Sequence, residues 1–271
     1  MAQRPHPRAI PALLLAAGRG ERMRPLTDSC PKPLLQVQGK PLLQWHLEAL
    51  SRAGCASALI NTAWLGEQME ARFGSRFDAQ PSTIAAATAS IAATVTTPAA
   101  PIALHYSHEG RDFGGALETA GGIVRALPLL AEVFWVAAGD VFAPDFVFAP
   151  EAVAHFKASP QLAHVWLVAN PDHNPGGDFG LSAEGLALNL PKPPPGAAQQ
   201  PRYTFSTIAL YKRGFFEGPW CAIPAGNPAG IQAPLAPMLR AAMDAGLVSA
   251  ALYTGRWTDV GTPQRLAELN R

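Results

Sequence analysis

Residues 15–27 read LAAGRGERMRPLT, and residues 31–34 read PKPL. The first stretch continues a short apolar run, Leu13–Ala17, which stops at a glycine as a buried parallel strand does. Gly18 and Gly20 let the backbone approach a ligand closely and point successive N–H groups at one anion. The sequence therefore predicts a strand that runs into an anion-binding turn, which is the beginning of an α/β fold.

Basic side chains surround this turn, namely Arg19, Arg22, Arg24 and Lys32. The first 40 residues carry seven basic and two acidic side chains, although the chain of 271 residues has a net charge of only +1. A nearly neutral chain lacks the bulk positive charge with which proteins attract nucleic acids or anionic membranes. The local excess instead suits a small polyanion, such as a nucleoside triphosphate.

Two common phosphate-binding motifs fail on spacing. A P-loop needs a Lys-Ser or Lys-Thr pair after its second glycine, and none follows here. The dinucleotide fingerprint needs a third glycine where Met23 stands. A glycine turn alone is weak evidence, but a lysine between two prolines, ten residues after Arg22, is far more specific. That lysine is Lys32.

Predicted strands and helices alternate along the rest of the chain. The predicted strands cover residues 58–61, 102–107, 133–138, 164–169, 186–190, 203–211 and 248–253. The predicted helices cover residues 41–54, 66–73, 117–127, 153–158, 235–245 and 263–270. Alternation at these lengths predicts a mostly parallel sheet with crossover helices, in a Rossmann-like, doubly wound α/β fold.

Two segments differ from this pattern. Residues 79–101 are rich in Ala, Thr and Pro and carry no charge, so we expect a flexible surface insertion. The alternative is an Ala-rich helix over residues 84–95. Residues 191–201 hold five prolines and are expected to form a semi-rigid loop that contains Lys192.

The expected location is the cytoplasm. The three cysteines are few, odd in number and widely spaced, which argues against a disulfide framework or a zinc site. Two arginines precede the apolar stretch Ala9–Ala17 and imitate a signal peptide, but cleavage there would remove part of the anion-binding motif. The longest uncharged run, residues 79–104, is interrupted by prolines and makes a poor membrane span. We therefore expect neither a membrane nor a nucleic-acid partner.

The N-terminal motif resembles the signature of the sugar-1-phosphate nucleotidylyltransferases, roughly LAAGxGxRMxPLTxxxPKPL. Further segments resemble other motifs of that family, namely LETAGG at 117–122, GD at 139–140, GGDFG at 176–180, YTFS at 203–206 and GRWTDVGTP at 255–263. The most similar subgroup is that of the short bacterial N-acetylmuramate-1-phosphate uridylyltransferases, which lack a C-terminal left-handed β-helix. The resemblance implies a GT-A-like nucleotidyltransferase fold.

The implied organisation is one nucleotidyltransferase domain over residues 1–271, with a nucleotide-binding part at about 9–145 and a sugar-binding part at about 146–271. The implied reaction is Mg²⁺-dependent transfer from UTP to N-acetylmuramate 1-phosphate, which yields UDP-MurNAc and pyrophosphate in peptidoglycan recycling. Another hexose 1-phosphate, such as that of glucose or mannose, or another nucleoside triphosphate remains an alternative. So does a non-catalytic nucleotide- or sugar-sensing subunit, which the presence of Lys32, Asp140 and Asp259 disfavours. The assembly is expected to be a monomer or a small homo-oligomer.

The resemblance also implies roles for single residues. Lys32 is expected to contact phosphate oxygens, and Arg22 to grip the phosphates that leave as pyrophosphate. The nucleotide-binding set is Ala17, Gly18, Gly20, Glu21, Arg22, Lys32, Glu118 and Thr119. Glu21, Glu118 and Thr119 are expected to act through backbone groups, because a carboxylate beside a triphosphate is repelled.

The sugar and the metal are assigned to later residues. The sugar-binding set is Ala138, Asp178, Thr204 and Ser206. Asp140 and Asp259 would form a hard-oxygen site for Mg²⁺ if the fold brings them together. Two positions depart from the subgroup, which often has an asparagine in place of Ala138 and usually has a glycine in place of Thr207.

Overall fold

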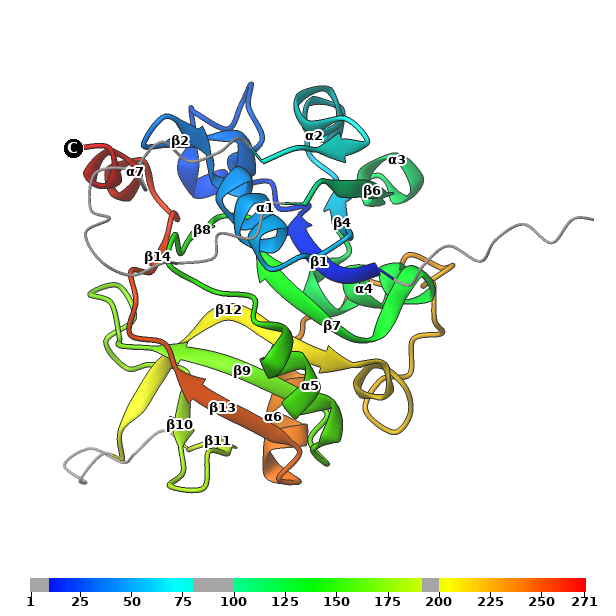
Figure 1. The fold of residues 1–271 in the computed structure, drawn as a ribbon, viewed down its shortest axis with the longest axis vertical. Helices are drawn as coiled ribbons and strands as arrows, with labels where there is room; N and C mark the ends of the chain where they lie inside the picture. The colour runs from blue at the N-terminus through cyan, green and yellow to red at the C-terminus, as the bar shows by residue number, and fades with distance from the viewer. Residues whose placement is uncertain (1–9, 80–99, 192–199) are drawn as a thin grey trace, which may run out of the picture.

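The computed structural model describes residues 10–79, 100–191 and 200–271. Within these ranges the strands and helices follow one another in the predicted order (Figure 1). The strands are β1 (Ile10–Ala16), β2 (Gln36–Val37), β3 (Lys40–Pro41), β4 (Ser57–Thr62), β5 (Arg76–Phe77), β6 (Ile102–His108), β7 (Leu130–Ala138), β8 (Val141–Phe142), β9 (Ala163–Val168), β10 (Phe179–Leu181), β11 (Ala187–Leu188), β12 (Arg202–Lys212), β13 (Val248–Leu252) and β14 (Thr258–Asp259). The helices are α1 (Leu42–Arg52), α2 (Gly66–Phe73), α3 (Glu109–Phe113), α4 (Glu118–Ala126), α5 (Pro150–Ala158), α6 (Ala236–Asp244) and α7 (Pro263–Leu269). Every predicted element is present, with each boundary within three residues of its predicted place.

The main sheet has ten strands. Along one path their order is β11-β10-β12-β7-β1-β4-β6-β5, and β9 and β13 continue from β12. The strands around β1 are parallel, because β1 pairs with both β4 and β7 in that sense and β4 pairs likewise with β6. β12 is antiparallel to β7 and β9, and it joins the early strands to the late ones (Figure 1). The predicted α/β class is confirmed.

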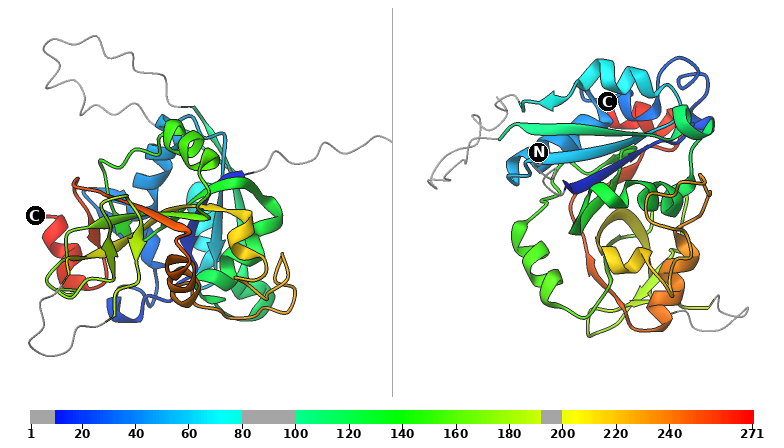
Figure 2. Two further views of the ribbon diagram at one scale, coloured as in Figure 1. Left: turned by 90° about the horizontal axis from the view of Figure 1, so that it is seen from below. Right: turned by 90° about the vertical axis from the view of Figure 1, so that its right-hand side faces the viewer.

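Helices cover both faces of this sheet, as a doubly wound fold requires (Figure 2, left). Successive side chains of β1 point to opposite faces of the sheet, so this strand packs against the helices on both faces. Leu13 packs in a cluster with Ile123 of α4, whereas Leu14 packs in a second cluster with Leu47 of α1. The first cluster also receives α6, and the second also receives α2 and α5. All of these apolar side chains are buried.

The C-terminal helix α7 returns to the N-terminal segment and lies beside β2 (Figure 1). Leu266 of α7 packs against a third cluster that includes Val37, Phe142 and Val260. The amide of Asn270, just after α7, accepts a hydrogen bond from the backbone N–H of Gln38 at 2.7 Å. This packing brings the segment before α7 close to the glycine-rich turn.

Two sequence expectations lie almost entirely outside the described ranges. They are the insertion at 79–101, with its helical alternative over 84–95, and the proline-rich loop that contains Lys192. In the part of the chain that is described, no helix is both long enough and apolar enough to cross a membrane.

Candidate functional site

The glycine-rich turn after β1 has a fixed shape. Gly20 has a φ of +67°, a conformation that side chains rarely tolerate. A Cβ atom at Gly20 would lie 3.1 Å from Cγ2 of Thr27 and 3.2 Å from Cβ of Lys32. The Thr27 hydroxyl donates a hydrogen bond of 2.8 Å to the carbonyl oxygen of Gly20. Glycine is therefore required for the turn to pack against the PKPL segment.

Two of the four basic residues around the turn brace it. The Arg19 guanidinium pairs with Asp28 at 3.0 Å and lies 3.8 Å from the centre of the Trp64 ring. Arg24 also pairs with Asp28, at 3.3 Å. The Trp64 indole N–H donates a hydrogen bond to the carbonyl oxygen of Thr27 at 2.9 Å, so Trp64 also stabilises the turn. Arg19 and Arg24 therefore share one acidic partner within the turn.

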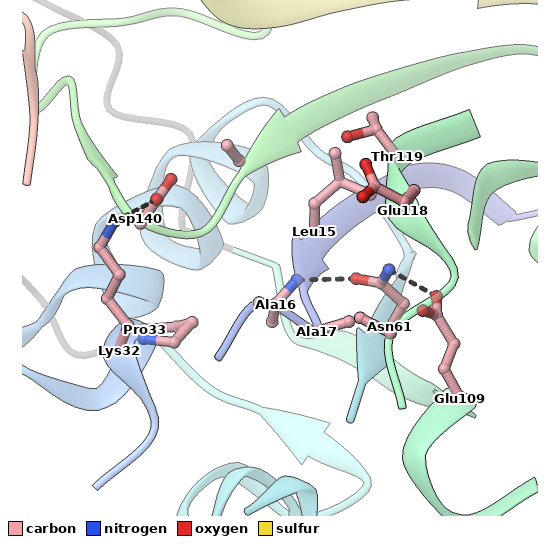
Figure 3. A pocket seen from close by; sticks show the side chains of 13 residues that line it. Leu15, Ala16, Ala17, Lys32, Pro33, Asn61, Glu109, Glu118, Thr119 and Asp140 are labelled. Atoms are coloured by element: carbon pink, nitrogen blue, oxygen red, sulfur yellow. Dashed lines mark hydrogen bonds and ion pairs between the residues drawn. The ribbon is translucent and has the colours of Figure 1, made fainter. Parts of the chain in front are cut away.

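A cavity of about 370 Å³ opens where β1, β4 and β7 end (Figure 3). Of the predicted nucleotide-binding residues, Ala17, Gly18, Lys32, Glu118 and Thr119 line it, and so does Asp140, which was predicted for the metal. Ala138, predicted for the sugar, lines it as well. The structure does not bring Gly20, Glu21 or Arg22 into this lining. The cavity lies at the carboxyl ends of parallel strands, which is where open α/β sheets bind ligands.

Lys32 and Asp140 point toward each other on one side of this cavity (Figure 3). Lys32 belongs to the short helix η2 (Lys32–Leu34), and only 8% of its surface is exposed. Its Nζ atom lies 2.5 Å from Oδ2 of Asp140, which directly follows β7. A buried ammonium group needs such a partner, because desolvation penalises an isolated charge. A cation and a carboxylate are thus held together in the cavity wall.

Asp259 lies next to Asp140 in the fold, although 119 positions separate them in the chain. β14 pairs with β8 in the antiparallel sense, and the N–H of Val260 donates to the Asp140 carbonyl oxygen at 3.0 Å. The Asp259 carboxylate contacts His173 Nε2 at 3.0 Å and forms an ion pair with Arg265. The predicted meeting of the two aspartates is therefore present in the backbone.

This pair of carboxylates suits a magnesium ion. In the described ranges, no group of three or more His, Cys, Asp or Glu side chains is arranged to hold a metal. Mg²⁺ commonly uses one or two protein carboxylates and completes its octahedron with water and substrate phosphates. Asp140 directly precedes β8 and Asp259 ends β14, the strand paired with β8, so the two could offer hard-oxygen ligands from adjacent segments. Such a donor set fits an ion that binds together with a phosphate substrate.

Arg22 belongs to the positive charge gathered near Asp259. Burial lowers the pKa of His173, and the charges of Arg265 and Arg22 lower it further. Burial likewise lowers the pKa of Arg265, with the charge of Arg22 as the second cause. His173 and Arg265 thus contact the Asp259 carboxylate, and the charge of Arg22 acts on both of them.

A buried network missed in the sequence links the two turns that border the cavity (Figure 3). The N–H of Ala16 donates to Asn61 Oδ1 at 2.7 Å, and Asn61 Nδ2 donates to Glu109 Oε1 at 2.7 Å. The N–H of Leu117 donates to Glu109 Oε2 at 2.8 Å. Glu109 is fully buried, and this burial raises the pKa of its carboxyl group. The network fixes the end of β1 relative to the turn that presents Glu118.

A second cavity, of about 350 Å³, adjoins the first. The two share the side chains of Leu15, Glu118, Thr119 and Ala138. Of the predicted sugar-binding residues, Ala138 and Asp178 line it. Asp178 is held in place, because its Oδ2 atom accepts a hydrogen bond from the N–H of Phe205 at 2.8 Å.

The other two predicted sugar-binding residues, Thr204 and Ser206, do not line either cavity. Side chains alternate along β12, and these two are buried on the side away from the second cavity. Their neighbours Phe205 and Thr207 line it instead. Thr207 lies in a break of the pairing register between β12 and β9, with a φ of +63°. Thr207, where the related subgroup usually has glycine, is therefore a residue with a strained backbone in the wall of the second cavity.

Comparison with known proteins agrees with this geometry. The family model of the MobA-like NTP transferase domain matches residues 12–252. An N-acetylmuramate alpha-1-phosphate uridylyltransferase of Neisseria meningitidis is 41% identical over 263 residues, which cover 95% of each chain. Another protein of that description, from Caulobacter vibrioides, is 29% identical over 78% of this chain and 87% of its own. A putative glucose-1-phosphate thymidylyltransferase from Bacillus anthracis, solved with a sucrose, has the same fold, with a TM-score of 0.70, 19% identity, and coverage of 97% of this chain and 94% of its own.

Proposed function

This chain belongs to the family of MobA-like NTP transferase domains, and on that premise we propose that it transfers a uridylyl group from UTP to N-acetylmuramate 1-phosphate. The coarser activity, that of a sugar-1-phosphate nucleotidylyltransferase, follows from the family and from the relatives of the same length. The base and the sugar are the finer parts of the proposal. They are supported by the uridylyltransferase of Neisseria meningitidis, which matches nearly the whole chain.

One observation carries this proposal most directly. The two cavities meet at Glu118, Thr119 and Ala138, and Asp140 lines the first of them beside Lys32. A nucleotide in the first cavity and a sugar phosphate in the second would bring their phosphates together near Asp140. Both reactants are anionic, so catalysis depends on holding them in line and neutralising their charge.

In the proposed reaction, a phosphate oxygen of the sugar phosphate attacks the α-phosphorus of the nucleotide. The new P–O bond forms as the bond to the β-phosphate oxygen breaks, and pyrophosphate carries away that electron pair. Lys32 would leave Asp140 and donate hydrogen bonds to phosphate oxygens at the reacting centre. Arg22 would bind the departing pyrophosphate, and the N–H groups after Ala17 would bind phosphate oxygens.

A Mg²⁺ ion held by Asp140 and Asp259 would supply charge neutralisation and orientation of the phosphates. Glu118 and Thr119 would border the base through the turn that Glu109 fixes. The proposed division of labour is a nucleotide part at about 9–145 and a sugar part at about 146–271. The proposed setting is recycling of cell-wall sugars in the cytoplasm.

The test is pyrophosphate release from UTP in the presence of Mg²⁺, with the 1-phosphates of N-acetylmuramate, N-acetylglucosamine, glucose and mannose. We expect the highest kcat/KM with N-acetylmuramate 1-phosphate, and loss of activity in Asp140→Asn. Arg52→Gln, at an exposed position on α1, is the matched control and should retain activity. Absence of pyrophosphate with every sugar would refute nucleotidylyl transfer. Release with glucose 1-phosphate alone would refute the assignment of the sugar.

A further inference from the structure

The second cavity holds one arginine, Arg240 of α6, in a mostly apolar lining. Phe179, Phe205 and Leu239 are among its apolar neighbours. Within the described ranges, no other Lys or Arg side chain lines this cavity. Arg240 is half-buried there, and a partner that compensates the charge of a partly desolvated guanidinium group stabilises it.

Arg240 is oriented by neutral groups. Its Nη1 atom donates a hydrogen bond of 2.7 Å to Oδ1 of Asn189. The Asn189 amide is itself fixed, because Nδ2 donates to both carboxylate oxygens of Asp244 at 3.1 Å. The guanidinium carbon lies 5.1 Å from the centre of the Phe179 ring, within range of a cation–π contact. These contacts hold the side chain in place, and the one carboxylate among them, that of Asp244, bonds to Asn189 and not directly to Arg240.

No carboxylate of this chain pairs with Arg240. Among the described residues it forms no ion pair, whereas Arg256, for example, pairs with Asp145 at 2.8 Å. The remaining ranges, 1–9, 80–99 and 192–199, contain neither Asp nor Glu in the sequence. The carboxylate of Asp178, in the same cavity, already accepts hydrogen bonds from Phe205 and Asn174. A ligand that brings its own anion would supply the missing partner.

Building on the proposed function, we propose that Arg240 binds a carboxylate on the acceptor sugar and thereby selects an acidic hexose 1-phosphate over neutral ones. Arg forms short, charge-assisted hydrogen bonds with carboxylates, and the apolar wall strengthens them by excluding water. N-Acetylmuramate differs from N-acetylglucosamine only in its lactyl ether, which ends in a carboxylate. A uronic acid 1-phosphate carries the same chemical group at another position.

The experiment compares Arg240→Gln and Arg240→Lys with the wild type. For each, kcat/KM is measured with N-acetylmuramate 1-phosphate, and Ki is measured for N-acetylglucosamine 1-phosphate as a competitor. We expect Arg240→Gln to lower kcat/KM for the muramate about 10- to 100-fold, the range of a lost charge-assisted hydrogen bond. The Ki of the neutral sugar and the KM of UTP should stay within twofold. Arg240→Lys, which keeps the charge, should fall between.

Controls separate this proposal from the broader one. Arg52→Gln should behave as the wild type, and thermal unfolding should show that each variant is folded. An equal loss for acidic and neutral sugars in Arg240→Gln, or no loss for either, would overturn the assignment while leaving nucleotidylyl transfer intact. Absence of turnover by the wild type with any sugar would instead refute the proposed function.

Discussion

Replacing Glu109 with alanine is expected to destabilise the fold and to weaken nucleotide binding. The change removes both acceptors of the network, so Asn61 Nδ2 and the Leu117 N–H lose their partners inside the protein. Each buried donor left unpaired costs about 1–3 kcal/mol. Loss of the buried carboxylate, whose pKa is raised by burial, offsets part of this cost. The free energy of unfolding should therefore fall by about 2–4 kcal/mol.

The functional effect follows from the position of Leu117, directly before Glu118. If the turn moves, the base side of the first cavity loses its shape, and the KM for UTP should rise about tenfold or more. The KM for the sugar phosphate should change less. Both quantities come from steady-state kinetics, and urea unfolding gives the stability.

Two further variants make this prediction more stringent. Glu109→Gln keeps one acceptor oxygen and should lower the free energy of unfolding by about half as much as Glu109→Ala does. This variant tests the role of Glu109 if the alanine variant does not fold. Gly122→Ala should disrupt the same network by a steric clash, because the new Cβ atom would lie 2.5 Å from Oε1 of Glu109. Glu132→Ala, at an exposed glutamate, is the control and should be neutral. This role would be refuted if Glu109→Ala changed the free energy of unfolding by less than about 0.5 kcal/mol and left the KM for UTP unchanged.

Three other outcomes are expected. Lys32→Met should lower kcat about 100-fold or more while thermal unfolding stays near that of the wild type, and kcat within threefold would exclude a role at the reacting centre. Burial lowers the pKa of His46 and of His164 to about 4, so the unfolded chain binds more protons between about pH 6.5 and pH 4. Stability should thus be complete above pH 6.5 and fall by up to about 3 kcal/mol per histidine as the pH drops to 4; urea unfolding that is flat over this window would contradict the assignment. Thr207→Gly should relieve the strain of a φ of +63° and stabilise the fold by up to about 1 kcal/mol, whereas a loss would mean that the threonine side chain contributes more than the strain costs.

Much of the fold could be predicted because its elements are long and periodic. The helix α1 buries Leu43, Leu47 and Leu50 on one face, as the spacing of these leucines indicates. The meeting of Asp140 and Asp259 was predicted from family resemblance, but the strands that produce it, β8 and β14, have two residues each. Strands this short carry no periodic signal.

The parts of the site that could not be predicted depend on side-chain direction and on partners distant in the chain. Sequence analysis selected Thr204 and Ser206, but the side of β12 that faces the cavity is set by pairing with β7 and β9. Arg19 carries a charge suited to phosphate, and only the fold shows that Asp28 and Trp64 engage it. Asn61 is the last residue but one of β4 and Glu109 follows β6, so the rule that ligands bind at the carboxyl ends of parallel strands could have indicated both.

The most direct measurement of the proposed reaction is identification of its products. Purified protein is incubated with UTP, N-acetylmuramate 1-phosphate and Mg²⁺. The products are then separated by chromatography and identified by mass spectrometry. We predict UDP-N-acetylmuramate and pyrophosphate in equal amounts, both lost when EDTA removes the metal and both lost in Asp140→Asn. Unchanged UTP and sugar phosphate, with a folded wild-type protein and Mg²⁺ present, would contradict uridylyl transfer to this sugar.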